Sequence, residues 1–267
     1  MKAKYLFPIL ASIILSSCSE YTYLYKSNDH LYKYEVAKTY YAMGNYTKAA
    51  TLIEDVLMQL KGTAQADESL YMLGSAYLNR KDYDLAATYF RQYYTSYPHG
   101  KLAEASRFQT GYALYLNSPE PRLDQTDSYH AIQELQIYTE YYPNGQYKKE
   151  AENMMYALQD KLAAKELESV KLYYHLGIYL GNNYQACIVT AQNALRDYPY
   201  SKLREEFYIY ILRAKYKVAH LSVIERQVER YRDALDEYYT FKNDFPDSKY
   251  MPEAERIQAE ASKHIPQ

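Results

Sequence analysis

Residues 73–98 read LGSAYLNRKDYDLAATYFRQYYTSYP, and this stretch decides the fold class of the chain. In its second half, Ala86, Phe90 and Pro98 follow Tyr83 by three, seven and fifteen residues. The full copies of this spacing are Tyr184, Cys187, Ala191 and Pro199, and Tyr231, Ala234, Tyr238 and Pro246; the partial copies are Tyr46, Ala49 and Ile53, and Ala131, Leu135 and Pro143. Recurrence of one spacing along a chain indicates a stack of similar structural units.

The residue types in this spacing suit pairs of α-helices that cross at close range. Gly74, and Ala37 at the corresponding place upstream, leave room on the first helix of a pair. Small residues occupy the matching place on the second helix: Ala49, Ala86, Ala131 and Cys187. The proline after a copy ends that helix, because it lacks an N–H and clashes with the preceding turn. The pattern resembles the tetratricopeptide repeat, which implies an all-α fold of pairs stacked into an α-solenoid.

Helical periodicity from Leu31 onward predicts about five helix pairs and a C-terminal closing helix. The predicted pairs are Leu31–Leu60, Ala66–Tyr97, Ala103–Tyr142, Ala151–Tyr198 and Arg204–Phe245, and the closing helix is Pro252–Lys263, with proline in its first turn. The third pair carries an insertion, Ser118-Pro119-Glu120-Pro121, that predicts a loop. The fourth has His175 where a small residue is expected, and the fifth has a long first arm, Phe207–Glu225.

The N-terminus carries a secretion and lipidation signal. Lys2 and Lys4 precede a short apolar segment, Leu6–Leu15, which is too short to span a bilayer comfortably. Small residues then lead to Cys18, an arrangement that resembles a bacterial lipobox. We therefore expect a signal peptide at residues 1–17 and lipid on Cys18, where two or three acyl chains make a stable anchor. Residues 18–30 are then a tether, residues 31–145 repeats 1–3, and residues 146–267 repeats 4 and 5 with the closing helix.

Composition narrows the function classes. The chain has 37 Tyr and no Trp, which suggests broad, half-buried surfaces rather than one dry core. The net charge of −2 becomes −4 when residues 1–17 are removed, because 29 basic and 33 acidic residues remain. Without a basic face, binding to nucleic acid is not expected.

We find no pattern that predicts catalysis, a cofactor or a metal. The sequence contains no phosphate-binding glycine loop and no Gly-x-Ser-x-Gly elbow. The histidines have no His or Cys partner at metal-ligand spacing: His30, His99, His130, His175, His220 and His264. Cys187 occupies a small-residue place in the repeat, which favours a buried packing role over a nucleophile. The sequence thus predicts that the protein is not an enzyme.

The loops between pairs carry a second recurrent motif. Its four copies are Tyr97-Pro98-His99-Gly100-Lys101-Leu102, Tyr142-Pro143-Asn144-Gly145-Gln146-Tyr147, Tyr198-Pro199-Tyr200-Ser201-Lys202-Leu203 and Phe245-Pro246-Asp247-Ser248-Lys249-Tyr250. Together with the lipobox, the insertion from Ser118 to Thr126 and the five repeats, this motif resembles the BamD (ComL/YfiO) lipoproteins, in their Bacteroides-type form. The resemblance covers nearly the whole chain.

This resemblance implies a subunit of the outer-membrane β-barrel assembly (BAM) complex, anchored in the outer membrane and facing the periplasm. The C-terminal repeats are then expected to hold the periplasmic domains of the barrel-forming subunit. The N-terminal repeats are expected to recognise unfolded outer-membrane protein precursors.

A candidate peptide groove follows from the register of the first helices. Residues three before and four after the small-residue mark face the concave side of a tetratricopeptide stack. The candidate residues are Tyr34, Lys38, Tyr41, Tyr71, Leu78, Phe108 and Tyr115. The rings would bind an extended precursor tail that ends in an aromatic residue, and Lys38 would meet its carboxylate. The alternative is that these aromatic residues only stabilise the stack.

Two other functions stay open at this point. One is glycan capture by a SusD-type lipoprotein, although those proteins are about twice as long and carry Trp platforms. The other is a repeat lipoprotein that coordinates cell-wall synthesis.

Overall fold

The computed structural model describes residues 23–266, and in this range the regular elements are α-helices without strands. The helices are α2 (His30–Ala42), α3 (Tyr46–Val56), α4 (Ala66–Asn79), α5 (Tyr83–Ser96), α6 (Ala103–Asn117), α7 (Thr126–Tyr141), α8 (Lys148–Leu176), α9 (Asn183–Asp197), α10 (Arg204–His220), α11 (Ile224–Asp244) and α12 (Met251–Ser262). The predicted signal peptide and Cys18 lie outside the described residues.

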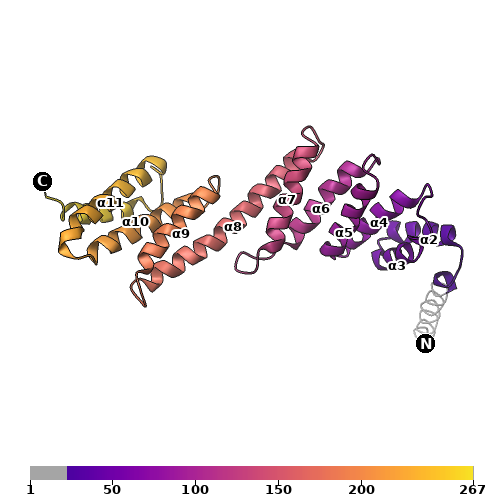
Figure 1. Cartoon of the computed structure of the whole chain (residues 1–267), viewed down its shortest axis with the longest axis horizontal. Coiled ribbons are helices and arrows are strands. Elements are labelled where there is room, and N and C mark those ends of the chain that lie inside the picture. The colour runs from indigo at the N-terminus through magenta and orange to yellow at the C-terminus, as the bar shows by residue number, and fades with distance from the viewer. Residues whose placement is uncertain (1–22, 267) are drawn as a thin grey trace, which may run out of the picture. The chain divides into compact units, whose positions relative to one another are not determined.

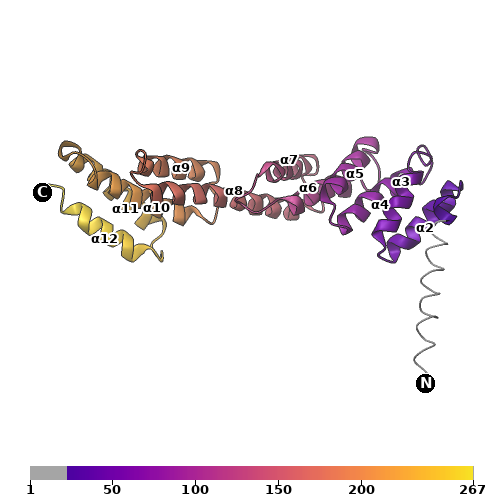
Figure 2. The same cartoon turned by 90° about the horizontal axis from the view of Figure 1, so that it is seen from below.

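Consecutive helices form five pairs and a closing helix, as the repeat predicts (Figures 1 and 2). Contacts between neighbours run from α2 through α6, and again from α9 through α12. The predicted all-α fold of tetratricopeptide type is confirmed. The predicted bounds of the helix pairs agree with the observed ones to within a few residues, because proline and asparagine residues stand at the helix ends. Asn45 and Asn182, for example, accept hydrogen bonds from the first turns of α3 and α9.

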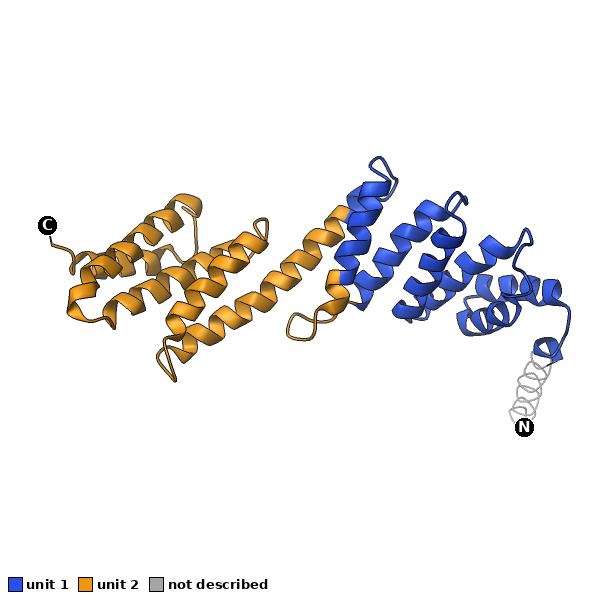
Figure 3. Ribbon diagram, viewed as in Figure 1, with its two compact units in different colours: residues 1–117, 130–151 blue, residues 118–129, 152–267 orange. Residues whose placement is uncertain are grey.

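The chain divides into two compact units (Figure 3). Unit 1 comprises residues 1–117 and 130–151, and unit 2 comprises residues 118–129 and 152–267. The division falls inside α8, a helix of 29 residues that belongs to unit 1 only in its first turn. The insertion after α6 groups with unit 2.

In the second and third pairs, the two helices cross at a glycine of the first helix. In unit 1, a Cβ atom on Gly74 would lie 2.9 Å from the ring of Phe90, and one on Gly111 would lie 2.7 Å from Leu135. The small residues predicted at the crossings are all fully buried: Ala37, Ala49, Ala86, Ala131, Cys187 and Ala234. The large side chain of the second helix thus fills the space that the first helix leaves empty.

The fourth pair crosses in a different way from the prediction. His175 is exposed, so it does not stand at a crossing. Because α8 is long, its buried face lies one to three turns earlier, at Ala163, Leu167 and Val170. In the fifth pair, the first arm ends at His220, and the next helix begins at Ile224, so the predicted arm to Glu225 was too long.

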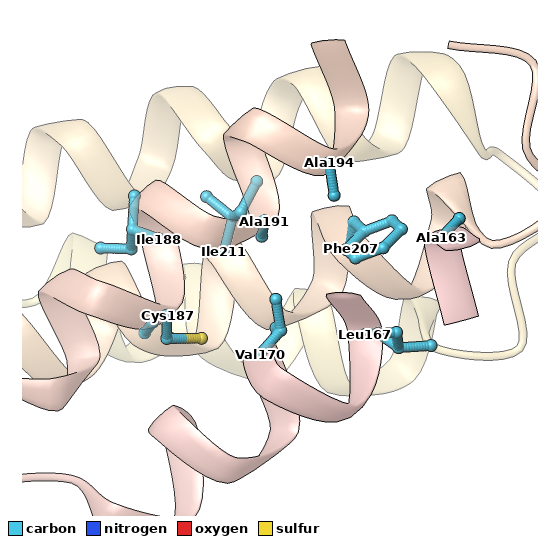
Figure 4. Packing of buried hydrophobic residues seen from close by; sticks show 10 residues of the cluster. Ala163, Leu167, Val170, Cys187, Ile188, Ala191, Ala194, Phe207 and Ile211 are labelled. Carbon is cyan, nitrogen blue, oxygen red and sulfur yellow. The ribbon is translucent and has the colours of Figure 1, made fainter. Parts of the chain in front are cut away.

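Cys187 packs in the core of unit 2, as the repeat predicts. It lies on α9 with Ile188 and Ala191, in a buried cluster that also contains Val170 of α8 and Ile211 of α10 (Figure 4). Burial raises the pKa of its thiol to about 12, because desolvation disfavours the thiolate. The thiol is therefore protonated and enclosed, which is the opposite of a reactive cysteine.

The four aromatic-Pro loops share one backbone turn. In each, the N–H three residues after the aromatic residue donates to the carbonyl of that residue, with N···O distances of 2.9–3.1 Å. The donors are Gly100, Gly145, Ser201 and Ser248. Two residues later, the next helix is about to begin, and its first N–H groups need acceptors from outside the helix.

The acceptor differs between glycine and serine loops. In the glycine loops, a buried tyrosine of the preceding helix supplies it: the N–H of Leu102 donates to the hydroxyl of Tyr93 at 3.3 Å. A Cβ on Gly100 would lie 2.7 Å from that hydroxyl, so glycine is needed there. Tyr138 and Gly145 repeat this arrangement, with Tyr147 N–H as the donor at 3.0 Å.

In the serine loops, the loop residue supplies its own acceptor. The N–H of Tyr250 donates to Ser248 Oγ at 2.9 Å, and that of Leu203 donates to Ser201 Oγ at 3.1 Å. The preceding helix has Phe241 or Ala194 at the place of the tyrosine, and neither carries a hydroxyl. In each loop, one hydroxyl therefore accepts a hydrogen bond from an N–H at the start of the next helix. The hydroxyl comes either from a tyrosine of the preceding helix or from the loop serine.

The insertion between α6 and α7 is a loop, as its prolines predict, and it is held on α8 within unit 2. Lys161 Nζ donates to Ser118 Oγ at 2.7 Å and to the Ser118 carbonyl at 3.1 Å. Gln125 is buried and donates to the carbonyl of Glu120 at 2.7 Å. Desolvation lowers the pKa of Lys161, which reflects its burial under this loop.

A double-mutant cycle at the first loop tests whether a loop serine can replace the tyrosine hydroxyl as the acceptor. Tyr93→Phe should lower the free energy of unfolding by about 1–2 kcal/mol, because it leaves the N–H of Leu102 without an acceptor. Gly100→Ser alone should also destabilise, because its side chain meets the Tyr93 hydroxyl. The double variant Tyr93→Phe/Gly100→Ser copies the native pair Phe241 and Ser248 and should recover most of the loss. Urea unfolding gives the free energy of unfolding of the unchanged chain, the two single variants and the double variant. If the losses of the single variants add up in the double variant, the serine does not replace the tyrosine hydroxyl.

Candidate peptide-binding surface

The seven predicted groove residues all lie in unit 1, on the first helices α2, α4 and α6, but they differ in burial. Tyr34 and Phe108 are buried. The other five are half-buried and reach the surface: Lys38, Tyr41, Tyr71, Leu78 and Tyr115. We call these five residues the tyrosine surface. Tyr34 and Phe108 act beneath it as packing residues.

Tyr41 and Tyr71 approach one another across two helices. Burial raises the pKa of both phenols, whereas a hydrogen bond of each with Ser75 acts in the opposite direction. Ser75 lies one residue after the small-residue mark Gly74 on α4. A serine at this place thus joins a tyrosine of α2 to a tyrosine of its own helix.

The rings of the tyrosine surface are held by edge contacts with the core. Tyr71 packs edge-on against Phe90, with centroids 5.4 Å apart, and against Tyr93 at 6.0 Å. Tyr41 packs edge-on against Tyr46 at 5.3 Å. Such pairs are worth about 0.5–1.5 kcal/mol beyond the area they bury, so the exposed ring edges have fixed positions.

Lys38 is not a free cation. Its Nζ atom lies 3.7 Å from Glu68 and 3.9 Å from Glu35, and 5.5 Å from the centroid of the Tyr34 ring. Tyr34 in turn donates to Glu68 at 2.8 Å. Burial, followed by the hydrogen bond to Glu68, raises the pKa of Tyr34. A carboxylate that binds Lys38 must therefore compete with the charges of Glu35 and Glu68.

Two further tyrosines extend this surface and were missed by the sequence analysis. Tyr147 stacks on Phe108 with ring centroids 4.5 Å apart, and Tyr112 stacks on Phe108 at 6.1 Å. Both are half-buried. Tyr147 also acts electrostatically on Tyr71, which places it beside the tyrosine surface. Its signal in the sequence is the last position of the aromatic-Pro motif, where two of the other loops have leucine.

Unit 2 has a candidate surface of a different chemistry. A cavity of about 480 Å³ lies between α10 and α12, with Tyr174 of α8 at its edge. Arg213 donates two hydrogen bonds to Glu253, at 2.8 and 2.5 Å, and this bond is the main cause that lowers the pKa of Glu253. Lys217, Arg256 and Glu260 also line the cavity, and Arg256 contributes to the lowered pKa of Glu253. The cavity thus combines apolar surface with three basic and two acidic side chains.

The described residues contain no group of three or more His, Cys, Asp or Glu side chains placed to hold a metal ion. Among them there is also no helix that is both long and apolar enough to cross a bilayer.

Comparison with known proteins gives one family and no curated relative. The family model described as YfiO, outer membrane lipoprotein, matches residues 26–181, which is more than half of the chain. The match runs from α2 through α8 and includes every residue of the tyrosine surface. No curated protein matches the chain. This chain therefore belongs to the YfiO (BamD-type) family of outer-membrane lipoproteins, which are not enzymes.

Proposed function

We propose that this lipoprotein is a scaffold subunit of the outer-membrane β-barrel assembly complex, which binds the barrel-forming subunit and unfolded barrel precursors. The observation that carries the proposal is the family match over α2 to α8. Membership of this family implies a role in outer-membrane assembly. The two surfaces described above have different chemistry, which suits two different protein ligands.

The tyrosine surface suits an extended precursor segment. Tyr41, Tyr71 and Tyr115 are half-buried tyrosines on three successive first helices of unit 1. Aromatic side chains of a peptide can pack on the rings, while the hydroxyls bind its backbone amides. A terminal carboxylate of the peptide would take the place of Glu68 beside Lys38.

The cavity of unit 2 suits a folded partner with an acidic side chain next to an apolar one. Tyr174, Tyr216 and Ile257 supply the apolar lining, and Lys217 and Arg256 supply the charge. We propose that a periplasmic domain of the barrel-forming subunit binds here. Charge complementarity of this kind contributes orientation and association rate more than affinity.

The two competing functions have weaker support. Capture of glycans by a SusD-type protein depends on Trp platforms, and this chain has no Trp. Coordination of cell-wall synthesis is distinguished from barrel assembly by the partner that the protein retains.

Binding of the precursor is tested with the double variant Tyr41→Ser/Tyr115→Ser. We expect its affinity for a labelled peptide with an aromatic C-terminal residue to fall roughly tenfold, which corresponds to about 1.4 kcal/mol of lost contact. Fluorescence anisotropy measures the affinity. Tyr32→Ser/Tyr156→Ser removes two exposed tyrosines elsewhere and should bind as the unchanged protein does. Equal binding by both double variants would show that the tyrosine surface only stabilises the fold.

Binding of the subunit is tested by affinity capture from detergent-solubilised membranes. The unchanged chain should retain the barrel-forming subunit, and Lys217→Glu/Arg256→Glu should lose it. Arg196→Glu/Lys202→Glu makes the same change in charge at exposed positions of unit 2 and should retain it. Capture of cell-wall synthases alone would refute the proposed function.

We propose that Cys18 carries the lipid, and this assignment has its own test. Cys18→Ala should release the chain into the soluble fraction, because the acyl chains are lost. Cys187→Ala, which changes the buried cysteine, should leave the chain on the membrane. If the Cys18→Ala variant stays bound after a carbonate wash, the assignment is wrong.

A further inference from the structure

Two neighbouring turns of unit 2 carry large apolar side chains in contact with solvent. The first turn, residues 177–181, joins α8 to α9, and the second, residues 221–223, joins α10 to α11. The exposed residues, including Ile224 at the start of α11, are Ile178, Tyr179, Leu180, Leu221, Val223 and Ile224. Ile178 and Leu221 line the same cavity, of about 320 Å³, so the two turns lie side by side. We call these six residues the apolar tips.

The backbone of the first turn is arranged so that its apolar residues face outward. Gly177, Leu180 and Gly181 all have positive φ, and Leu180 is 90% exposed. Leucine rarely adopts this conformation, because its Cβ meets the following carbonyl. The turn is nevertheless well tied: Asn183 N–H donates to the Gly177 carbonyl at 2.8 Å, and its side chain donates to the Tyr179 carbonyl at 2.7 Å. A strained but fixed turn that exposes leucine points to a contact outside the chain.

The two turns themselves contain no acidic residue. No Asp or Glu stands between Glu168 and Asp197, or between Glu206 and Glu225, and both turns lie inside these two stretches. Arg213 and Lys215 of the second stretch are paired with Glu253 and Glu237, and Glu225 directly follows Ile224. Arg230 lines the cavity between the turns and donates to Ser222. Apolar side chains with this cation behind them are complementary to an apolar layer covered by anionic groups.

We propose that the apolar tips insert into the headgroup and upper acyl region of a lipid bilayer. The chain belongs to a family of outer-membrane lipoproteins, and a lipid bilayer is therefore part of its surroundings. The tips are single side chains projecting from two turns, and lipid deforms around such projections without a matching groove. Tyrosine and isoleucine at the tip, with Arg230 behind them, follow the order in which side chains enter a membrane interface. Anionic lipid phosphates would meet Arg230.

The absence of Trp from the chain provides a direct test. Tyr179→Trp places a single Trp at the tip, which can be excited selectively over the tyrosines, and changes no residue of the tyrosine surface or of the cavity between α10 and α12. The full chain, purified from membranes, is reconstituted into vesicles of phosphatidylethanolamine and phosphatidylglycerol. We expect the Trp emission to shift to shorter wavelength. Lipids brominated in the upper acyl chain should quench it, since interfacial side chains enter roughly 5–10 Å.

The matched control is Tyr200→Trp, which also places one Trp at an exposed tyrosine of unit 2, in the loop between α9 and α10. Its emission should keep the wavelength of a hydrated indole and resist quenching by brominated lipids. Adding Leu180→Glu and Ile224→Glu to Tyr179→Trp should abolish the shift and the quenching, while circular dichroism shows the same helix content.

Two results would overturn the proposal. In the first, Trp at position 179 is as hydrated and as weakly quenched as Trp at position 200. In the second, its emission shifts only when the purified barrel-forming subunit is added, which would make the apolar tips a protein-docking surface. Neither result bears on the tyrosine surface, so the proposed function stands or falls separately.

Discussion

The close approach of two helices at a residue without a side chain is the constraint on which the rest of this structure depends. At Gly74 and Gly111, the ring of Phe90 and the side chain of Leu135 occupy the space where a Cβ would stand. Because each pair is this tight, its apolar residues beyond the crossing are left for the neighbouring pair. That is why consecutive helices pack throughout both units.

The aromatic-Pro loops are constrained by the hydrogen bonds that the next helix needs. A helix that starts just after a turn has N–H groups without partners, and here one hydroxyl serves each start. It comes from a buried tyrosine where the loop has glycine, and from the loop serine where the helix has none. Tyrosine therefore has two roles in this chain. Its ring fills the core of a pair, and its hydroxyl satisfies a neighbouring loop or a carboxylate, as Tyr34 does with Glu68.

The proposed binding surfaces consist of residues that remain accessible after the helices have packed. In unit 1, rings that extend beyond the core form a surface with hydroxyls on it, and Ser75 links two of them. In unit 2, Arg213 and Glu253 neutralise one another, and Lys217 and Arg256 add positive charge to the same cavity. The apolar tips, by contrast, are held outward by their own backbone. The three surfaces therefore differ in chemistry, and we propose a different kind of ligand for each.

The sequence by itself determined the helix pairs, their bounds and the small residues at the crossings, because spacing and punctuation are local properties. It also predicted that the groove residues share one face of the first helices, since register follows from periodicity. Only the tertiary structure decided their depth: Tyr34 and Phe108 are buried because neighbouring helices and Tyr147 cover them. It likewise decided that His175 is exposed, because the length of α8 moves the crossing elsewhere. The cavity between α10 and α12 joins residues about forty positions apart, and no local pattern carries that information, since such contacts depend on how whole helices pack.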